Sequence, residues 1–208
     1  METINILTNV SKKEIKEATD FADSQIIFPL SKHLASRINF VIALVGSVSR
    51  GMAVHDEKGH FDLDYQIRLR DRPLPDGDEI RSLFLQELRS LGFPQTENST
   101  TALTIRMKNR AFSFDFVLIY EGKKNDLILK RTVNPNSPNT NRYVWCPLPS
   151  RLSDFYDYFD SLPPKDKESV RKGVIASKKE EYLKSSELRR SGTEIFVQEV
   201  QKFYDRTH

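Results

Sequence analysis

The chain has 208 residues, of which 38% are hydrophobic and 29% are charged, and its formal net charge is +3. These values are those of an ordinary globular protein with room for a core, and the charge is too small to imply nucleic-acid binding by itself. Because the sequence lacks a long apolar run and a basic leader, we expect no transmembrane helix and no signal peptide. Cys146 is the single cysteine, which excludes an internal disulfide and a Cys-rich zinc site and favours a cytoplasmic location.

The N-terminal part of the chain predicts a helix followed by a short strand. Ser11 begins the helix, because Glu14 three residues later completes a capping box. Apolar residues then recur at helical spacing, and Pro29 is expected to kink or divide the helix. The apolar run Phe40–Val45 predicts a strand that leads into the turn at Gly46–Ser47.

Two later strands carry acidic residues in alternation with apolar ones. In residues 61–67 the apolar side chains alternate with Asp62 and Asp64, so the acids lie on the other face of the strand. Asp115 alternates in the same way with phenylalanines in residues 112–118. Single acids on the solvent face of a half-buried strand are ordinary. Three of them after a Gly-Ser turn favour a metal site, because aspartate is depleted from strands.

The remaining pattern predicts a mixed α/β fold, in which a mixed sheet is flanked by helices and a helical part follows. We expect a core at residues 1–148, including the N-terminal helix, and a C-terminal helical part at residues 149–208 packed on it. The further predicted elements are a helix capped by Asp78 and ending at Gly92, strands at residues 102–107, 112–120, 127–131 and 143–146, a loop at residues 133–139, and helices from Leu152, over residues 165–188, and from a cap at Thr193.

The order of the Gly-Ser turn and the three acids suits the chemistry of a nucleotide. Gly46 and Ser47 let backbone N–H groups and a hydroxyl approach phosphate oxygens. Carboxylate oxygens from Asp62, Asp64 and Asp115 are ligands that Mg²⁺ prefers. Two such ions, Mg²⁺ or Mn²⁺, would activate an attacking hydroxyl and neutralise a leaving pyrophosphate. The three acids are therefore predicted to be catalytic and metal-binding, and to converge on one pocket.

These motifs resemble those of the DNA polymerase β-like nucleotidyltransferase superfamily. The resemblance rests on Gly46–Gly51, on Phe61–Asp64 and on Asp115, and it covers residues 40–120. Within this superfamily, the segments Gly46–Gly51 and Phe61–Asp64 are similar to those of two branches. One is the cGAS/DncV-like enzymes, which make cyclic or linear oligonucleotide messengers, and the other is the minimal nucleotidyltransferases. The segment Met52–His60 between the turn and the acids is longer than in the minimal branch, which favours the messenger synthases.

A basic segment follows in the helical part of the chain. Residues 164–190 contain nine Lys or Arg and five Asp or Glu. A solvated helix of mixed charge is one interpretation, and a phosphate-binding helix is the other. The resemblance implies that a lysine from this part contacts the triphosphate, and Lys178 is the candidate. Arg50 is a further candidate for phosphate, and Tyr182 for stacking on the nucleobase.

We therefore expect a metal-dependent nucleotidyltransferase that transfers a nucleoside monophosphate from a nucleoside triphosphate to an acceptor hydroxyl and releases pyrophosphate. The acceptor stays open: a second nucleotide, an RNA end, a protein hydroxyl or an antibiotic. No membrane partner is expected. The alternative from a different class is a catalytically silent relative that binds nucleotides or serves as a scaffold, although all three acids are present.

Overall fold

A computed structural model describes residues 8–208 except 71–72, 124, 135–136, 149 and 185–189. The chain forms two compact units, which are described separately. The sheet unit comprises Ser11–Gly46 and Asp62–Leu148, and the helical unit comprises the described residues of Met1–Val10, Ser47–Phe61 and Pro149–His208. The domain boundary near residue 148 stays a prediction.

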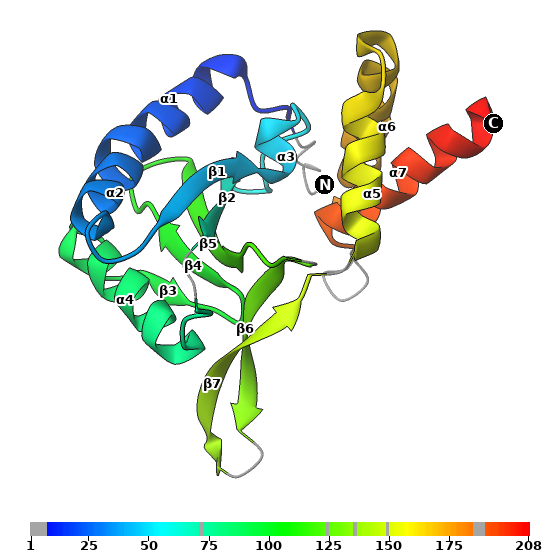
Figure 1. The fold of residues 1–208 in the computed structure, drawn as a ribbon. Helices are drawn as coiled ribbons and strands as arrows, with labels where there is room; N and C mark the ends of the chain where they lie inside the picture. Colours follow the sequence, from blue (N-terminus) through cyan, green and yellow to red (C-terminus); the bar gives the residue numbers. More distant parts are fainter. Residues whose placement is uncertain (1–7, 71–72, 124, 135–136, 149, 185–189) are drawn as a thin grey trace. The chain divides into compact units, whose positions relative to one another are not determined.

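The sheet unit contains a seven-stranded sheet and its helices (Figure 1). The strands follow the order β1-β2-β5-β4-β3, and β6 pairs with both β5 and β7. The expected α/β class with a mixed sheet is therefore confirmed. Its elements are α1 (Lys12–Ala22), η1 (Asp23–Ile27), α2 (Phe28–Leu34), β1 (Phe40–Val45), β2 (Phe61–Leu69), α4 (Gly77–Ser90), β3 (Glu97–Asn98), β4 (Ala102–Arg106), β5 (Phe112–Tyr120), β6 (Leu127–Asn134) and β7 (Ser137–Pro147).

The apolar face of the sheet packs against α1 and α4. Phe21 of α1 lies with its ring centroid 6.0 Å from that of Phe114 on β5. Phe84 of α4 meets Phe40 of β1 edge to face, with 5.3 Å between the centroids. Both Phe84 and Phe114 are fully buried. Aromatic side chains therefore contribute to the packing of both helices on the sheet, and the opposite face carries Asp62 and Asp64 of β2 and Asp115 of β5.

The N-terminal helix does not end at Pro29 but contains a wider, π-helical turn before it. The capping box of Ser11 and Glu14 is present, as predicted. A π-helical segment, η1, precedes α2, and Pro29 lies in the first turn of α2. Proline lacks the N–H that an α-helix needs at this point, and its ring crowds the carbonyl four residues earlier. The π turn accommodates the proline without a break in the chain of helical residues.

Two predicted helix caps are wrong by two residues each. Asp76, not Asp78, caps α4, because its side chain accepts the backbone N–H groups of residues 78 and 79. The Asp78 carboxylate instead accepts the N–H of Tyr143 on β7, at 2.7 Å. Ser191, not Thr193, caps α7, with Glu194 completing a capping box. In both cases several polar residues compete near the helix start, and backbone geometry selects one of them.

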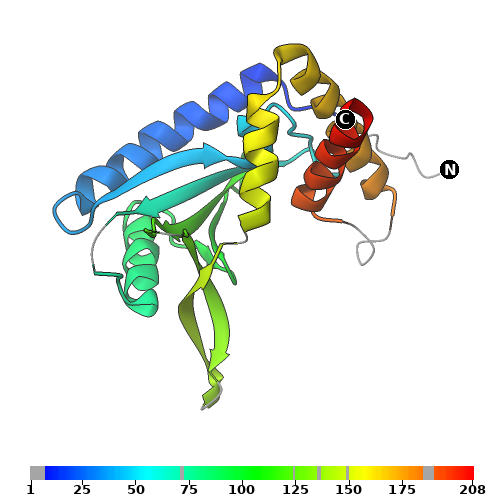
Figure 2. The ribbon, with the colours of Figure 1, turned by 45° about the vertical axis from the view of Figure 1, so that its right-hand side comes forward.

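The strands β6 and β7 form a long hairpin that projects from the rest of the sheet (Figure 2). The sequence predicts shorter strands and a loop over residues 133–139. This prediction is wrong, because β6 extends to Asn134 and β7 begins at Ser137. Pairing along the full hairpin, which includes Thr132 opposite Arg142, outweighs the low strand propensity of asparagine and proline.

The helical unit contains three longer helices packed around an apolar cluster. Phe159, Val174, Ile195 and Phe196 are buried in this cluster. None of the helices described here combines the length and apolar character that crossing a membrane requires. The predicted helix over residues 165–188 ends at Tyr182, and its last four predicted residues lie outside the described part. The helices of the unit are α3 (Gly46–Ser49), whose first residue belongs to the sheet unit, α5 (Ser150–Ser161), α6 (Pro164–Tyr182) and α7 (Gly192–Thr207).

Candidate active site

Strand alternation places the three acids away from the core, as predicted. On β2 the odd-numbered residues from 61 to 69 are buried, whereas Asp62 is exposed and Asp64 is half-buried. On β5 Asp115 is half-buried between the buried Phe114 and Phe116. The carboxylates therefore lie on the polar face of their strands.

β2 and β5 are neighbours in the sheet, and they run parallel. At one end, the Ser113 hydroxyl donates to the Asp62 carboxylate, with an offset of 51 residues. At the other end, the Glu121 N–H donates to the Leu69 carbonyl at 3.0 Å, which is almost the same offset. The difference in residue number between bonded residues of the two strands is thus nearly the same at both ends. Two adjacent strands with this property run in the same direction. Asp64 therefore lies beside Asp115, because these residues are also 51 apart, and parallel neighbours are separated by roughly 4.8 Å.

Two hydroxyl groups orient the carboxylates of this face. Ser113 donates to Asp62, and Thr104 of β4, the residue directly opposite Asp115, donates to the Asp115 Oδ1 at 2.5 Å. Both hydroxyl residues are buried. The sequence interpretation missed them. Ser113 could have been found by alternation, since it lies two residues before Asp115, and Thr104 by its place as a polar residue in an apolar strand.

The acids influence one another electrostatically. Burial raises the pKa of Asp115, and the negative charge of Asp62 raises it further, while the Thr104 hydrogen bond and the nearby Arg106 oppose this shift. Arg106 itself pairs with Glu97 on β3, at 2.8 Å between Nε and Oε1. The polar face therefore holds clustered negative charge with one exposed arginine beside it. Arg106 and Glu97 were not identified from the sequence.

Gly46 lies directly against one of the predicted metal ligands. Its φ is +70°, a conformation that side chains rarely adopt. A Cβ atom at this position would come within 2.1 Å of the Asp64 Oδ2. Two observations therefore require glycine at this position. The positive φ disfavours other residues, and a Cβ atom would collide with the Asp64 carboxylate. The Gly-Ser turn therefore lies close to Asp64 at Gly46, a contact that the sequence analysis did not predict.

The predicted convergence of all three carboxylates on one point is not seen in these side-chain positions. Across the part of the chain that the structure describes, no three His, Cys, Asp or Glu side chains lie close enough to hold a common ion. Asp62 and Asp115 are turned to their hydroxyl partners instead. The acids share one face and lie on neighbouring strands, and their joint binding of an ion stays a prediction.

Ser47 and Arg50 belong to the helical unit. The Ser47 carbonyl accepts the N–H of Met52 at 2.8 Å, which closes the turn after α3. The Arg50 guanidinium stacks on Tyr156, 4.0 Å from the ring centroid, and lies 3.7 Å from an Asp160 oxygen. These contacts hold Arg50 on α5. Its expected role at phosphate stays a prediction, as does that of Ser47.

Lys178 and Tyr182 lie on α6 of the same unit. Only 9% of Lys178 is exposed, and its Nζ donates to the Met52 carbonyl at 3.1 Å. Tyr182 is half-buried in the last turn of the helix. Lys178 therefore has a structural hydrogen bond to the segment after α3, and its contact with a triphosphate stays a prediction.

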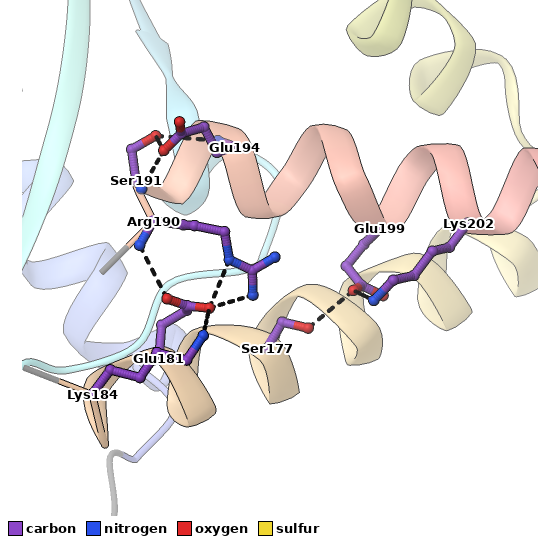
Figure 3. A network of polar contacts seen from close by, with 8 residues as sticks. All are labelled: Ser177, Glu181, Lys184, Arg190, Ser191, Glu194, Glu199 and Lys202. Carbon is purple, nitrogen blue, oxygen red and sulfur yellow. Dashed lines mark hydrogen bonds and ion pairs between the residues drawn. The ribbon is translucent and has the colours of Figure 1, made fainter. Parts of the chain in front are cut away.

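Polar contacts fasten the C-terminal part of α6 to the residues around α7 (Figure 3). The buried Glu181 carboxylate accepts from Lys184 at 2.6 Å and from the backbone N–H of Arg190 at 3.0 Å, and it also pairs with the Arg190 guanidinium. These donors lower the pKa of Glu181 to about 2, with the Lys184 contact the largest cause. One turn earlier on α6, Ser177 donates to Glu199 of α7.

Comparison with known proteins identifies the fold. No protein-family model and no curated protein matches the sequence. Among solved structures, Escherichia coli DncV in a 3′-deoxy GTP bound form aligns with a TM-score of 0.64 and 11% identity, over 100% of this chain and 73% of DncV. The STING-associated CdnE c-di-GMP synthase of Capnocytophaga granulosa aligns with a TM-score of 0.61 and 17% identity, over 93% of this chain.

Escherichia coli CdnC in complex with HORMA-deltaN gives a TM-score of 0.60 and 16% identity, over 98% of this chain. The chain spans 62% of the length of CdnC and 60% of that of CdnE. All three neighbours are CD-NTases, and their alignments extend over nearly the whole chain. This chain therefore has the fold of the cGAS/DncV-like nucleotidyltransferases, the branch that its Gly-Ser and Asp-x-Asp motifs resemble.

Proposed function

We propose that this protein is a metal-dependent nucleotidyltransferase that transfers a nucleoside monophosphate from a nucleoside triphosphate to an acceptor hydroxyl. The observation that carries the proposal is the shared polar face of β2 and β5, where Asp62, Asp64 and Asp115 occur in parallel register with Gly46 against Asp64. Structural neighbours with bound nucleotides support it: CdnC is described with ATP, and DncV with 3′-deoxy GTP.

The three carboxylates suit one or two Mg²⁺ or Mn²⁺ ions by their chemistry. All supply hard oxygen donors, and the pKa of Asp115 is raised by burial and also by the negative charge of Asp62, which a cation would offset. When bound, such ions neutralise phosphate charge and make a coordinated hydroxyl more acidic. Ser113 and Thr104 each donate to one oxygen, Oδ1, of Asp62 and Asp115, which leaves the second oxygen of each carboxylate for an ion.

The chain's own groups would position the nucleotide. The backbone N–H groups of the Gly46–Ser47 turn at the start of α3 would approach phosphate oxygens, and the Ser47 hydroxyl is a further donor. Arg50, Lys178 and Tyr182 are the proposed contacts to triphosphate and base. Catalysis of this kind depends on positioning and charge stabilisation.

A second nucleotide is the acceptor that we propose, because one neighbour is described as a c-di-GMP synthase and another as a cyclic dinucleotide synthase. The product would then be a cyclic or linear oligonucleotide. A minimal transferase acting on protein, RNA or an antibiotic is the other enzymatic candidate. A silent nucleotide-binding or scaffolding relative is the alternative from a different class.

The enzymatic proposal is tested by comparing wild type with Asp64→Asn. Each protein is incubated with the four nucleoside triphosphates and Mg²⁺ or Mn²⁺, pyrophosphate is measured, and products are identified by mass spectrometry. We expect the variant to release at least roughly 100-fold less pyrophosphate, because an amide cannot replace a carboxylate between cations. It should also melt at a higher temperature without metal, since one of the adjacent negative charges is gone.

Asp20→Asn is the matched control, because Asp20 is an exposed acid on α1 of the same unit. It should keep wild-type activity. Pyrophosphate release that is equal in wild type and Asp64→Asn would show that the acids are not the catalytic groups. No release by wild type under any of these conditions would favour the silent relative.

A further inference from the structure

The helical unit contains a hollow that the proposed reaction does not use. Its volume is about 410 Å³, and it lies between one stripe of α6, the turn at Gly51 and the side chain of Asn9. Sites for small molecules have volumes of roughly 300–1,000 Å³. The hollow is therefore large enough for a ligand rather than for water alone.

The hollow is basic. Arg171, Lys172 and Lys179 line it, together with a single acid, Glu168. These residues recur three, four and seven positions apart, so they form one face of α6. Glu168 lies 3.8 Å from Arg171 and 3.9 Å from Lys172, distances too long for strong hydrogen bonds. Three cations thus line the hollow beside one acid, and Arg171 and Lys172 are only loosely paired with that acid.

Arg171 is held in place for recognition of an anion. Its Nε donates to the Arg50 carbonyl at 2.7 Å, and its guanidinium lies 5.8 Å from the Phe159 ring centroid. About a third of the side chain is exposed. An anchored guanidinium loses little conformational entropy when it binds, and its fork matches two oxygens of a phosphate.

The remaining lining is apolar or neutral. Ile175 and Ala176 lie between the cations on the same stripe, and Asn9 is a neutral lining residue. Lys178, the candidate for the triphosphate, does not line this hollow, because it is buried against the Met52 carbonyl. The hollow and the predicted triphosphate lysine therefore use different faces of α6.

We propose that this hollow is a second, non-catalytic site for a phosphate-bearing ligand of nucleotide size. The phosphate is held by Arg171, Lys172 and Lys179, and the organic part lies on Ile175 and Ala176. Such a site would let a nucleotide bind to the helical unit without occupying the acidic face of the sheet unit.

The test is calorimetry with AMP in EDTA, with adenosine and inorganic phosphate as comparison probes. We expect AMP to bind, adenosine not to bind, and inorganic phosphate to bind more weakly than AMP. The double variant Lys172→Gln/Lys179→Gln should bind AMP at least roughly tenfold more weakly, because it loses two charged contacts. Higher salt should weaken AMP binding to wild type.

Three control proteins make the result specific. Lys165→Gln, an exposed lysine of α6 outside the hollow, should bind AMP as wild type does. Lys172→Arg/Lys179→Arg should retain binding, because it keeps both charges. Asp64→Asn should also retain it, because Asp64 belongs to the other unit.

Equal AMP affinity in wild type and in the double glutamine variant would overturn the inference, as would equal binding of adenosine or no binding at all. Loss of AMP binding in Asp64→Asn, with retention in the double variant, would place AMP on the acidic face. That outcome would refute this second site and leave the proposed transferase standing. Retained AMP binding in a wild-type protein that releases no pyrophosphate would support this second site and count against the proposed transferase.

Discussion

Replacement of Gly46 by alanine tests the contact between the Gly-Ser turn and Asp64. The new Cβ would lie 2.1 Å from the Asp64 Oδ2, whereas real Cβ contacts stay beyond 3.0 Å, so the carboxylate must move by at least 0.9 Å. A displacement near 1 Å at a reacting centre costs roughly 100-fold in rate. We therefore expect pyrophosphate release by Gly46→Ala to fall by about two orders of magnitude.

The same change should reduce stability by two separable contributions. A non-glycine residue at φ +70° costs about 1–3 kcal/mol, and the overpacking against Asp64 costs about 1–3 kcal/mol more. Gly59 supplies the matched control, because its φ is +76° and nothing lies within 4 Å of its Cβ position. Gly59→Ala should therefore show only the backbone cost and keep its activity.

The measurements are pyrophosphate release and urea unfolding of both variants, with Gly46→Ala repeated in an Asp64→Ala background. Removal of the carboxylate should recover the overpacking cost, which appears as a coupling free energy between the two positions. Wild-type activity in a folded Gly46→Ala protein would refute the reasoning. So would equal destabilisation by Gly46→Ala and Gly59→Ala with no coupling to position 64.

Two further predictions concern buried charges. Arg81 of α4 is 1% exposed and donates to Asn98 and to three backbone carbonyls. Arg81→Met should therefore lower the free energy of unfolding in urea by about 3–5 kcal/mol, whereas Arg106→Met, at an exposed arginine, should lower it by less than about 1 kcal/mol. Similar losses in both variants would contradict the role of Arg81. Glu181 has a folded pKa of about 2, below its ordinary 4.5, so its contribution to stability is present above pH 4.5 and is lost as the pH falls from about 4.5 towards 2. Glu181→Gln should lack this part of the pH dependence, whereas the exposed Glu180→Gln should keep it, and identical profiles for wild type and Glu181→Gln would contradict the assignment.

The sequence by itself determined the local features of this protein. Alternation predicted which residues of β2 are buried and that Phe114 and Phe116 of β5 are buried around Asp115, and the capping box at Ser11 predicted the first helix correctly. The Gly-Ser turn and the three acids predicted the fold branch that the structural neighbours show. The alternation and the capping box depend on residues within a few positions of one another, so a local pattern is sufficient to predict them.

Other features were decided by contacts between distant residues. Asp64 lies beside Asp115 only because β2 and β5 run parallel at an offset of 51 residues, and no local pattern encodes that offset. The long β6–β7 hairpin likewise overrides the turn-forming residues at its end.

The lysines of α6 show the same limit. The sequence placed Lys178 and Lys179 in one basic segment, but the structure buries Lys178 against Met52 and places Lys179 in the hollow. The roughly 100° between successive residues of a helix separates their environments. Which face meets the rest of the unit follows from packing against α7 and the segment after α3, so only the tertiary structure could assign the two lysines different surroundings.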